Sequence, residues 1–150
     1  MSALSAGRVV DILLVEDDPG DELITREAFA DNKIKNTLHV ARDGQEGLDF
    51  LYRRGVHANA PTPDLILLDL NLPRYDGRQL LEAIKSDADL CHIPVVVLTT
   101  SAAEEDILRS YKLHANAYVT KPVDLDQFMK AVREIDEFFV QVVRLPSNGA

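Results

Sequence analysis

Unbroken apolar runs alternate along this chain with stretches in which apolar residues recur every three or four positions. The clearest run is 65–68, four aliphatic residues followed by Asp69 and by a turn that Pro73 marks. Apolar runs without alternation are typical of strands in a parallel sheet that helices cover on both faces. The pattern therefore predicts a buried central strand that delivers Asp69 to its carboxyl end.

Three other apolar runs predict strands, at residues 9–15, 95–100 and 117–120, and a stretch that alternates in part predicts one at 37–41. Helices with apolar residues at spacings of three and four are expected to begin near residues 20, 44, 77, 101 and 125. Residues 53–63 are polar and are predicted to be loop. Strands and helices that alternate five times predict an α/β fold, a doubly wound parallel sheet with helices on both faces.

The size and charge of the chain narrow its class. It has 150 residues, of which 46% are hydrophobic, and this suits one domain with its own core. We expect that domain at residues 9–145, between a flexible N-terminus (1–8) and a C-terminal tail (146–150). The net charge of -9 disfavours nucleic acid and anionic membrane surfaces as partners. One cysteine, Cys91, and no apolar run of the roughly 20 residues that span a membrane predict a cytoplasmic protein.

Charged and hydroxyl residues close four of the predicted strands. Glu16 and Asp17 follow the first strand, Asp69 closes the third, Thr99 the fourth and Lys121 the fifth. Because the carboxyl ends of parallel strands meet at one edge, we expect these side chains to lie together. Carboxylates this close repel one another unless they are protonated or bridged by a cation, and oxygen ligands favour Mg²⁺. A carboxylate there could attack a phosphoryl group, while the lysine and the hydroxyl stabilise the transferred oxygens.

The order and spacing of these motifs resemble the receiver domains of two-component response regulators, over residues 9–143. The motifs are Glu16-Asp17, Asp69 with Asn71-Leu72-Pro73 and Asp76-Gly77, Thr99, Tyr118 and Lys121-Pro122. The resemblance implies a flavodoxin-like sheet of five strands in the order 2-1-3-4-5, with five helices.

The resemblance also implies roles for these residues. Asp69 would accept a phosphoryl group from the phosphohistidine of a sensor histidine kinase, with help from Lys121 and Thr99. Mg²⁺ would be held by Glu16 through water, by Asp17 and Asp69 directly, and by the backbone carbonyl of Asn71. The phosphorylated state would be read by a switch pair, Thr99 and Tyr118. Such a protein is no enzyme in the usual sense, because it catalyses only its own phosphorylation and dephosphorylation.

A closer similarity is to the single-domain regulators that serve bacterial phytochrome histidine kinases. The segments that carry it are 53–55, 58–61, 69–73, 97–101, 135–136 and 145–146. It implies a bacteriophytochrome kinase as partner and a signal that leaves through the receiver's own surface. The last predicted helix carries apolar residues beyond those that the core needs: Phe138, Phe139, Val142, Val143 and Leu145. They predict a homodimer formed through the fourth helix, the fifth strand and the last helix.

Several residues keep a second interpretation. Tyr118 suits core packing as well as a switch, and Lys121 could be a solvated surface lysine. A cis peptide bond at Pro122 is one alternative, which would aim the lysine inward. Turn chemistry explains Asp18, which we therefore leave out of the metal site. The histidines lack metal-ligand spacing and are assigned no role: His39, His57, His92 and His114.

Three other functions compete with the receiver. A phosphohydrolase of the haloacid dehalogenase kind also uses a strand-end aspartate and Mg²⁺. That pattern needs a second aspartate where this chain has Asn71, and it puts the nucleophile on the first strand. A nucleotide-binding module is disfavoured because no glycine-rich phosphate loop follows a strand. A receiver that only dimerises is disfavoured because every chemical position is filled.

Overall fold

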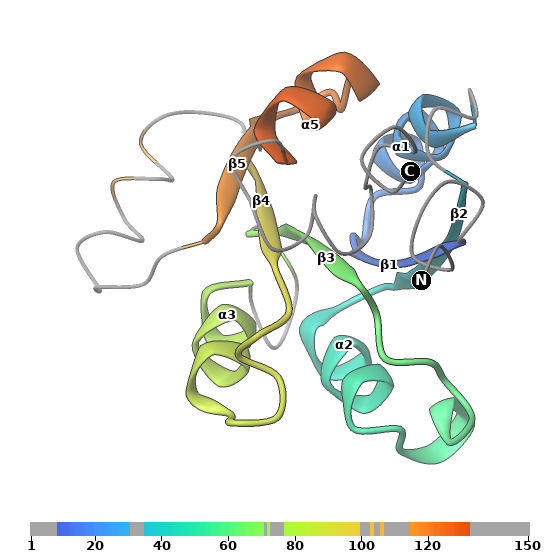
Figure 1. Ribbon diagram of the computed structural model, residues 1–150, viewed down its shortest axis with the longest axis vertical. Coiled ribbons are helices and arrows are strands. Elements are labelled where there is room, and N and C mark those ends of the chain that lie inside the picture. The colour runs from blue at the N-terminus through green and yellow to red at the C-terminus, as the bar shows by residue number, and fades with distance from the viewer. Residues whose placement is uncertain are drawn as a thin grey trace, which may run out of the picture.

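The computed structural model describes residues 9–30, 35–70, 72, 77–99, 103, 106 and 115–132. Five parallel strands form one sheet in the order β2-β1-β3-β4-β5, which confirms the predicted order (Figure 1). The strands are β1 Val10–Val15, β2 Asn36–Ala41, β3 Leu65–Asp69, β4 Val95–Thr99 and β5 Ala117–Thr120. Their bounds agree with the predicted ones to within one residue.

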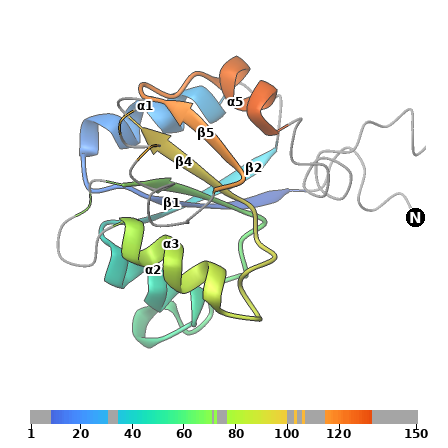
Figure 2. The same cartoon turned by 90° about the vertical axis from the view of Figure 1, so that its left-hand side faces the viewer.

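Four α-helices and one short 3-10 helix lie among the described residues. They are α1 Pro19–Phe29, α2 Gly44–Leu51, the 3-10 helix η2 Gly55–His57, α3 Gly77–Ser86 and α5 Leu125–Val132. Helices α1 and α5 cover one face of the sheet, and α2 and α3 cover the other (Figure 2). No helix in the described part of the chain is both long and apolar enough to cross a membrane.

One segment differs from the sequence-based prediction, and two predicted helices lie partly outside the described residues. The loop predicted over residues 53–63 contains η2, because Ala58 N closes a 3.2 Å hydrogen bond to Gly55 O that polar composition does not signal. Of the predicted fourth helix, the structure describes only Ala103 and Asp106, and both are helical. Its capping-box residues Ser101 and Glu104, and the final part of the last predicted helix, fall outside the described residues.

The sheet lies between two apolar layers. Successive residues of a strand point to opposite faces. Leu14 accordingly packs with residues of α1 and α5, whereas Leu13 packs with residues of α2 and α3. In the first layer the rings of Phe29 and Phe128 meet edge to face, with centroids 4.8 Å apart. All five residues of β3 are buried, which is why the central strand shows no alternation of apolar and polar residues.

Capping side chains fix the starts of two helices. Asp18 Oδ1 accepts a 3.0 Å hydrogen bond from Gly20 N, and Asp43 Oδ1 accepts a 2.8 Å hydrogen bond from Glu46 N. Pro19 at the first helical position costs α1 no hydrogen bond, because that amide has no partner inside a helix. Asp18 therefore has the turn role expected from the sequence.

Helix α3 begins against the end of β3. Gly77 N donates a 3.3 Å hydrogen bond to Leu70 O. A Cβ on Gly77 would lie 2.5 Å from Asp69 O and 2.6 Å from Leu70 Cα, which are both backbone atoms. Only glycine permits this approach, so α3 is docked directly behind Asp69.

Candidate functional site

Three charged side chains meet where β1, β3 and β5 end. The Lys121 ammonium lies 2.9 Å from Glu16 Oε1 and 3.1 Å from Asp69 Oδ2. Glu16 is fully buried and Asp69 is 4% exposed. The structure thus brings together three residues that the sequence placed at separate strand ends.

Main-chain hydrogen bonds set the positions of two of these side chains. Glu16 N donates to Ala41 O at 2.9 Å, and Lys121 N donates to Thr99 O at 2.8 Å. Each bond continues the pairing of a strand one residue beyond its end. The Lys121–Pro122 peptide bond is cis, one of the two alternatives that the sequence left open. Glu16 and Lys121 therefore start from fixed backbone positions.

Asp17 completes an acidic cluster with Glu16 and Asp69. One carboxylate oxygen from each lies within 4.8 Å of the others. Glu16 Oε1 is buried, and no hydrogen bond of acceptable geometry reaches it from the described residues, although the Lys121 ammonium is close. A set of hard oxygen donors that includes one unsatisfied buried oxygen fits a divalent cation. Asn71, the fourth residue expected at the metal, lies outside the described residues.

Burial and neighbouring charges shift two pKa values in this cluster. Burial, assisted by the hydrogen bond with Asp69, raises the pKa of Glu16 to about 7, against the opposing effect of Lys121. Burial alone would lower the pKa of Lys121, but its contacts with Glu16, Asp21 and Asp69 outweigh burial and raise that pKa. Lys121 is therefore a permanent cation at neutral pH.

A further carboxylate, that of Asp21, contacts Lys121 and was missed by the sequence analysis. Asp21 lies in the first turn of α1, and its Oδ2 accepts a 2.9 Å hydrogen bond from Lys121 Nζ. The available signal was its position, one turn of helix after the acids that follow β1. No spacing rule connects a helical aspartate with a lysine 100 residues later in the chain.

The hydroxyl and the aromatic residue expected at the site lie on β4 and β5. Thr99 ends β4, is 3% exposed and pairs in register with Thr120. Tyr118 is half-buried and packs against the apolar layer that includes α2 and α3. Its hydroxyl accepts a 3.4 Å hydrogen bond from Ala115 N. This arrangement is compatible with both interpretations of Tyr118, packing and switch.

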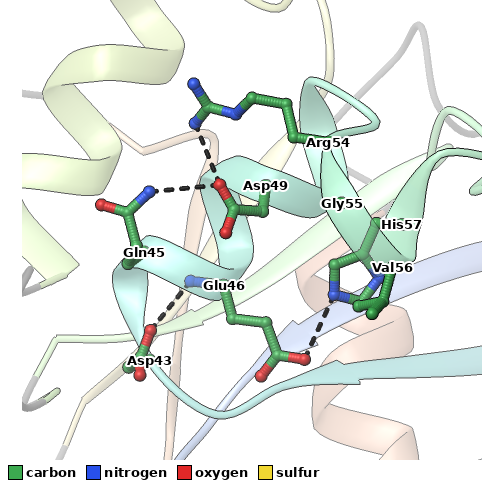
Figure 3. A pocket seen from close by; sticks show the side chains of 8 residues that line it. All are labelled: Asp43, Gln45, Glu46, Asp49, Arg54, Gly55, Val56 and His57. Carbon is green, nitrogen blue, oxygen red and sulfur yellow. Dashed lines mark hydrogen bonds and ion pairs between the residues drawn. The ribbon is translucent and has the colours of Figure 1, made fainter.

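A second set of polar residues lines a cavity of about 350 Å³ beside α2 and η2 (Figure 3). Its side chains pair with one another. His57 Nε2 lies 3.2 Å from Glu46 Oε2, and Arg54 makes a 3.1 Å ion pair with Asp49. His39 has a similar partner elsewhere, Asp11 Oδ1 at 3.0 Å. These are the internal contacts of a solvated surface, and they indicate no ligand.

The fold and the strand-end cluster define a class of protein. A five-stranded parallel sheet in the order 2-1-3-4-5, with a lysine and acids gathered at its carboxyl edge, is the architecture of a response regulator receiver. The sequence model of the family described as response regulator receiver domain matches residues 12–133. The chain belongs to this family, whose members are signalling proteins that act with sensor histidine kinases.

Particular relatives are response regulators, and two of the similar solved structures are of phytochrome response regulators. The chain is 46% identical to response regulator Rcp1 of Synechocystis sp. over 136 residues, which cover 91% of this chain and 92% of that protein. The structure of the bacteriophytochrome response regulator AtBRR is 45% identical, with a TM-score of 0.80, over 85% of this chain and 93% of that one. A phosphorylated cyanobacterial phytochrome response regulator, RcpA, is 48% identical, with a TM-score of 0.71, over 87% of this chain and 94% of that one.

Proposed function

We propose that this protein is a single-domain response regulator that accepts a phosphoryl group on Asp69 from a sensor histidine kinase, in a reaction that requires Mg²⁺. The observation that carries the proposal is the 3.1 Å contact between Asp69 Oδ2 and the Lys121 ammonium at a buried strand end. A fixed cation beside a carboxylate nucleophile is what phosphoryl transfer needs, because negative charge spreads over the transferred oxygens. The phosphorylated structure of the relative RcpA supports the same chemistry.

The residues of the cluster divide the work of the transfer. An Asp69 oxygen forms the new bond to phosphorus as the bond to the kinase's imidazole nitrogen breaks. Lys121 neutralises one phosphoryl oxygen, and the Thr99 hydroxyl donates a hydrogen bond to another. Bound Mg²⁺ would supply further neutralisation of the phosphoryl oxygens. It would be held by Glu16 through water, by Asp17 and Asp69 directly, and by the carbonyl of Asn71.

The relatives support the choice of metal class and of partner. One structure of Rcp1, with a TM-score of 0.71 to this chain, is a Mn²⁺-bound form, so a close relative takes a divalent cation. Because AtBRR is a bacteriophytochrome response regulator and RcpA is a phytochrome response regulator, we propose a phytochrome-type histidine kinase as the phosphodonor, in the cytoplasm. Rcp1 matches this chain over 92% of its own length, so that relative consists almost entirely of the matched region.

The output of the phosphorylated state would be read on the receiver's own surface. A new dianion on Asp69 offers the Thr99 hydroxyl a strong acceptor, and movement of Thr99 would let Tyr118 turn inward. The proposed output is a change in self-association through the fourth helix, the fifth strand and the last helix. The test of coupling is the Thr99→Ala variant, which should lose the phosphorylation-dependent chemical-shift changes around Tyr118.

The phosphorylation site is tested by substitution. Asp69→Asn should take up no phosphate from acetyl phosphate in the presence of Mg²⁺, because the amide is not a nucleophile at this position. The matched control is Asp18→Asn, which removes one carboxylate nearby but keeps a good N-cap for α1. Mass spectrometry of the intact protein measures the added phosphate. Equal labelling of Asp69→Asn and the control would refute the assignment.

The partner is tested separately by phosphotransfer profiling. The host's histidine kinases are each loaded with labelled phosphate and mixed briefly with the regulator. We expect a phytochrome kinase to transfer its label fastest. Faster transfer from a kinase of another class would contradict the proposed partner while leaving Asp69 as the acceptor.

A further inference from the structure

The Lys121 ammonium has three N–H groups and three carboxylate neighbours. It lies 2.9 Å from Glu16 Oε1, 2.9 Å from Asp21 Oδ2 and 3.1 Å from Asp69 Oδ2. An ammonium has no more than three hydrogens to donate. Two of these contacts are hydrogen bonds, to Asp21 and Asp69, and the contact with Glu16 is an ion pair without hydrogen-bond geometry. The ammonium therefore already has three anionic neighbours before any phosphoryl group arrives.

Phosphorylation changes this balance. A phosphoryl group on Asp69 brings new anionic oxygens to the place where Lys121 lies, and the ammonium must give one contact to them. Asp69 stops being a carboxylate when it forms the acyl phosphate, so its contact with Lys121 passes to the phosphoryl group. For the ammonium to move closer to the phosphoryl oxygens, it has to weaken its contact with Glu16 or with Asp21. The contact that breaks is the one with the smallest free-energy cost. That cost depends on how well water can replace the ammonium beside the carboxylate.

The exposures of the three acids single out Asp21. The side chains of Glu16 and Asp69 are 0% and 5% exposed, whereas that of Asp21 is 31% exposed. A buried carboxylate that loses its cation is left uncompensated, which is strongly unfavourable. Asp21 can instead be rehydrated. It also lies in the first turn of α1, where the helix dipole stabilises a negative charge without help from Lys121.

We propose that Asp21 is a positioning residue for Lys121: it holds the ammonium in the unphosphorylated protein and gives it up to the phosphoryl group. The inference rests on the proposed phosphorylation of Asp69. It adds that Asp21 competes with the phosphoryl group for the Lys121 ammonium. Breaking the Lys121–Asp21 contact is a cost that every phosphorylation must meet. Asp21 therefore slows acquisition of the phosphoryl group and weakens its hold once it is bound.

The test compares variants of the full chain in saturating Mg²⁺. Asp21→Asn removes the charge with little change of shape, and Asp21→Glu keeps the charge. Glu27→Gln is the matched control, because it removes one exposed carboxylate from the far end of the same helix. The first measurement is the rate constant of phosphorylation by acetyl phosphate. The second is the affinity for beryllium trifluoride, a phosphoryl analogue that binds without a chemical step.

Asp21→Asn should phosphorylate about two- to fivefold faster than wild type and bind beryllium trifluoride tighter by a similar factor, the range that a partly exposed ion pair supports. Asp21→Glu should return both values toward wild type, and Glu27→Gln should leave both unchanged. The Lys121 ammonium signal in nitrogen-edited NMR spectra should shift in Asp21→Asn and be unaffected in Glu27→Gln.

Two outcomes overturn the inference. The first is that Asp21→Asn matches Glu27→Gln in both measurements. The second is that Asp21→Asn is phosphorylated more slowly than wild type, which would make Asp21 an aid to transfer instead of a competitor. The proposed function fails separately, if wild type takes no phosphate or if Asp69→Asn takes as much as wild type. If wild type is phosphorylated and Asp21→Asn has the same phosphorylation rate and beryllium trifluoride affinity as wild type, only the proposed role of Asp21 is refuted.

Discussion

At the scale of single residues, strand ends made the site predictable. Glu16 and Lys121 directly follow a strand and Asp69 ends one, so parallel topology brings all three to one edge of the sheet. Asp21 could not be found in this way. Its contact with Lys121 depends on how the first turn of α1 passes the end of β5, which is a matter of tertiary packing and leaves no trace in local spacing.

The metal site makes a prediction about two neighbouring acids. Asp17→Ala should weaken Mg²⁺ binding by at least about tenfold, and more than Glu16→Ala does, because a direct ligand is lost instead of one that acts through water. Titration of each variant with MgCl₂, followed by amide NMR shifts, measures both affinities. Equal losses would contradict the ranking of the two residues.

A second residue-scale prediction concerns Glu22 on α1. The hydrogen bond from Arg26, with further help from Arg42, holds the pKa of the Glu22 carboxyl below its ordinary value of 4.5. A lowered pKa in the folded state contributes stability above the unfolded pKa, and this is lost as pH falls through the folded pKa. Glu22→Gln should lower the free energy of unfolding at neutral pH by roughly 0.5 to 1 kcal/mol.

The pH dependence separates this ion pair from general packing. The difference in unfolding free energy between wild type and Glu22→Gln should shrink as the pH is lowered past 4.5 and further into the acid range. Urea denaturation at a series of pH values measures it. Glu27→Gln, on the exposed part of the same helix, is the control and should show little change. A Glu22→Gln deficit that is constant with pH would argue for lost packing instead.

At the scale of elements, apolar runs and single glycines explain which strand and helix bounds could be predicted from the sequence. The bounds of β3 and β4 were predictable because burial on both faces demands continuous apolar residues, and both strands end at a polar residue. The 3-10 turn at Gly55–His57 was not, because a single turn buries no apolar face and so leaves no periodicity. The start of α3 is different again, because the backbone of Asp69 and Leu70 lies so close that only glycine fits at position 77.

The close approach at Gly77 can be tested by adding a methyl group. Gly77→Ala should destabilise the protein by about 1 to 3 kcal/mol, because its Cβ would lie 2.5 Å from Asp69 O and only a shift of backbone relieves that contact. The matched change, Gly20→Ala in α1, meets only Asp18 Oδ1 at 3.6 Å. It should be neutral or stabilising by up to about 1 kcal/mol, because alanine is the better helix former.

Thermal or urea unfolding measures both glycine variants in parallel. Their opposite signs would show that close packing outweighs helix propensity at the start of α3. Gly77→Ala should also slow phosphorylation by acetyl phosphate, since the methyl group pushes on the backbone of the acceptor residue. A Gly77→Ala variant as stable as Gly20→Ala would mean that α3 docks more loosely behind Asp69 than its geometry indicates.

At the scale of the whole molecule, the sequence pattern and the family resemblance contributed different parts. Alternating strands and helices predicted a parallel sheet covered on both faces, but periodicity carries no information about which strands are neighbours. The order 2-1-3-4-5 came from the resemblance and is confirmed. Right-handed crossovers in that order place α1 on one face and α2 and α3 on the other. Helix α5 follows the last strand, so no crossover fixes its face, and it lies on the face of α1 (Figure 2).

Self-association is the prediction that belongs to this scale. Phe128 of α5 is fully buried in the layer shared with α1, so the core already has its aromatic anchor from this helix. The sequence nevertheless continues with Phe138, Phe139, Val142 and Val143, which lie outside the described residues. Surplus apolar residues of this kind favour a partner surface, and a twofold dimer is the commonest solution.

Sedimentation velocity at micromolar protein, with and without beryllium trifluoride, tests this association. Wild type should form dimers, and the double variant Phe138→Asp with Phe139→Asp should sediment as a monomer in both states, because charges at a close apolar contact are left unpaired. Gln127→Asp, on the exposed side of α5, is the control and should dimerise like wild type. A monomeric wild type in both states, or a double variant that dimerises as well as the control, would contradict the proposed interface. A dimer that strengthens only with the phosphoryl analogue would instead connect the interface to Asp69.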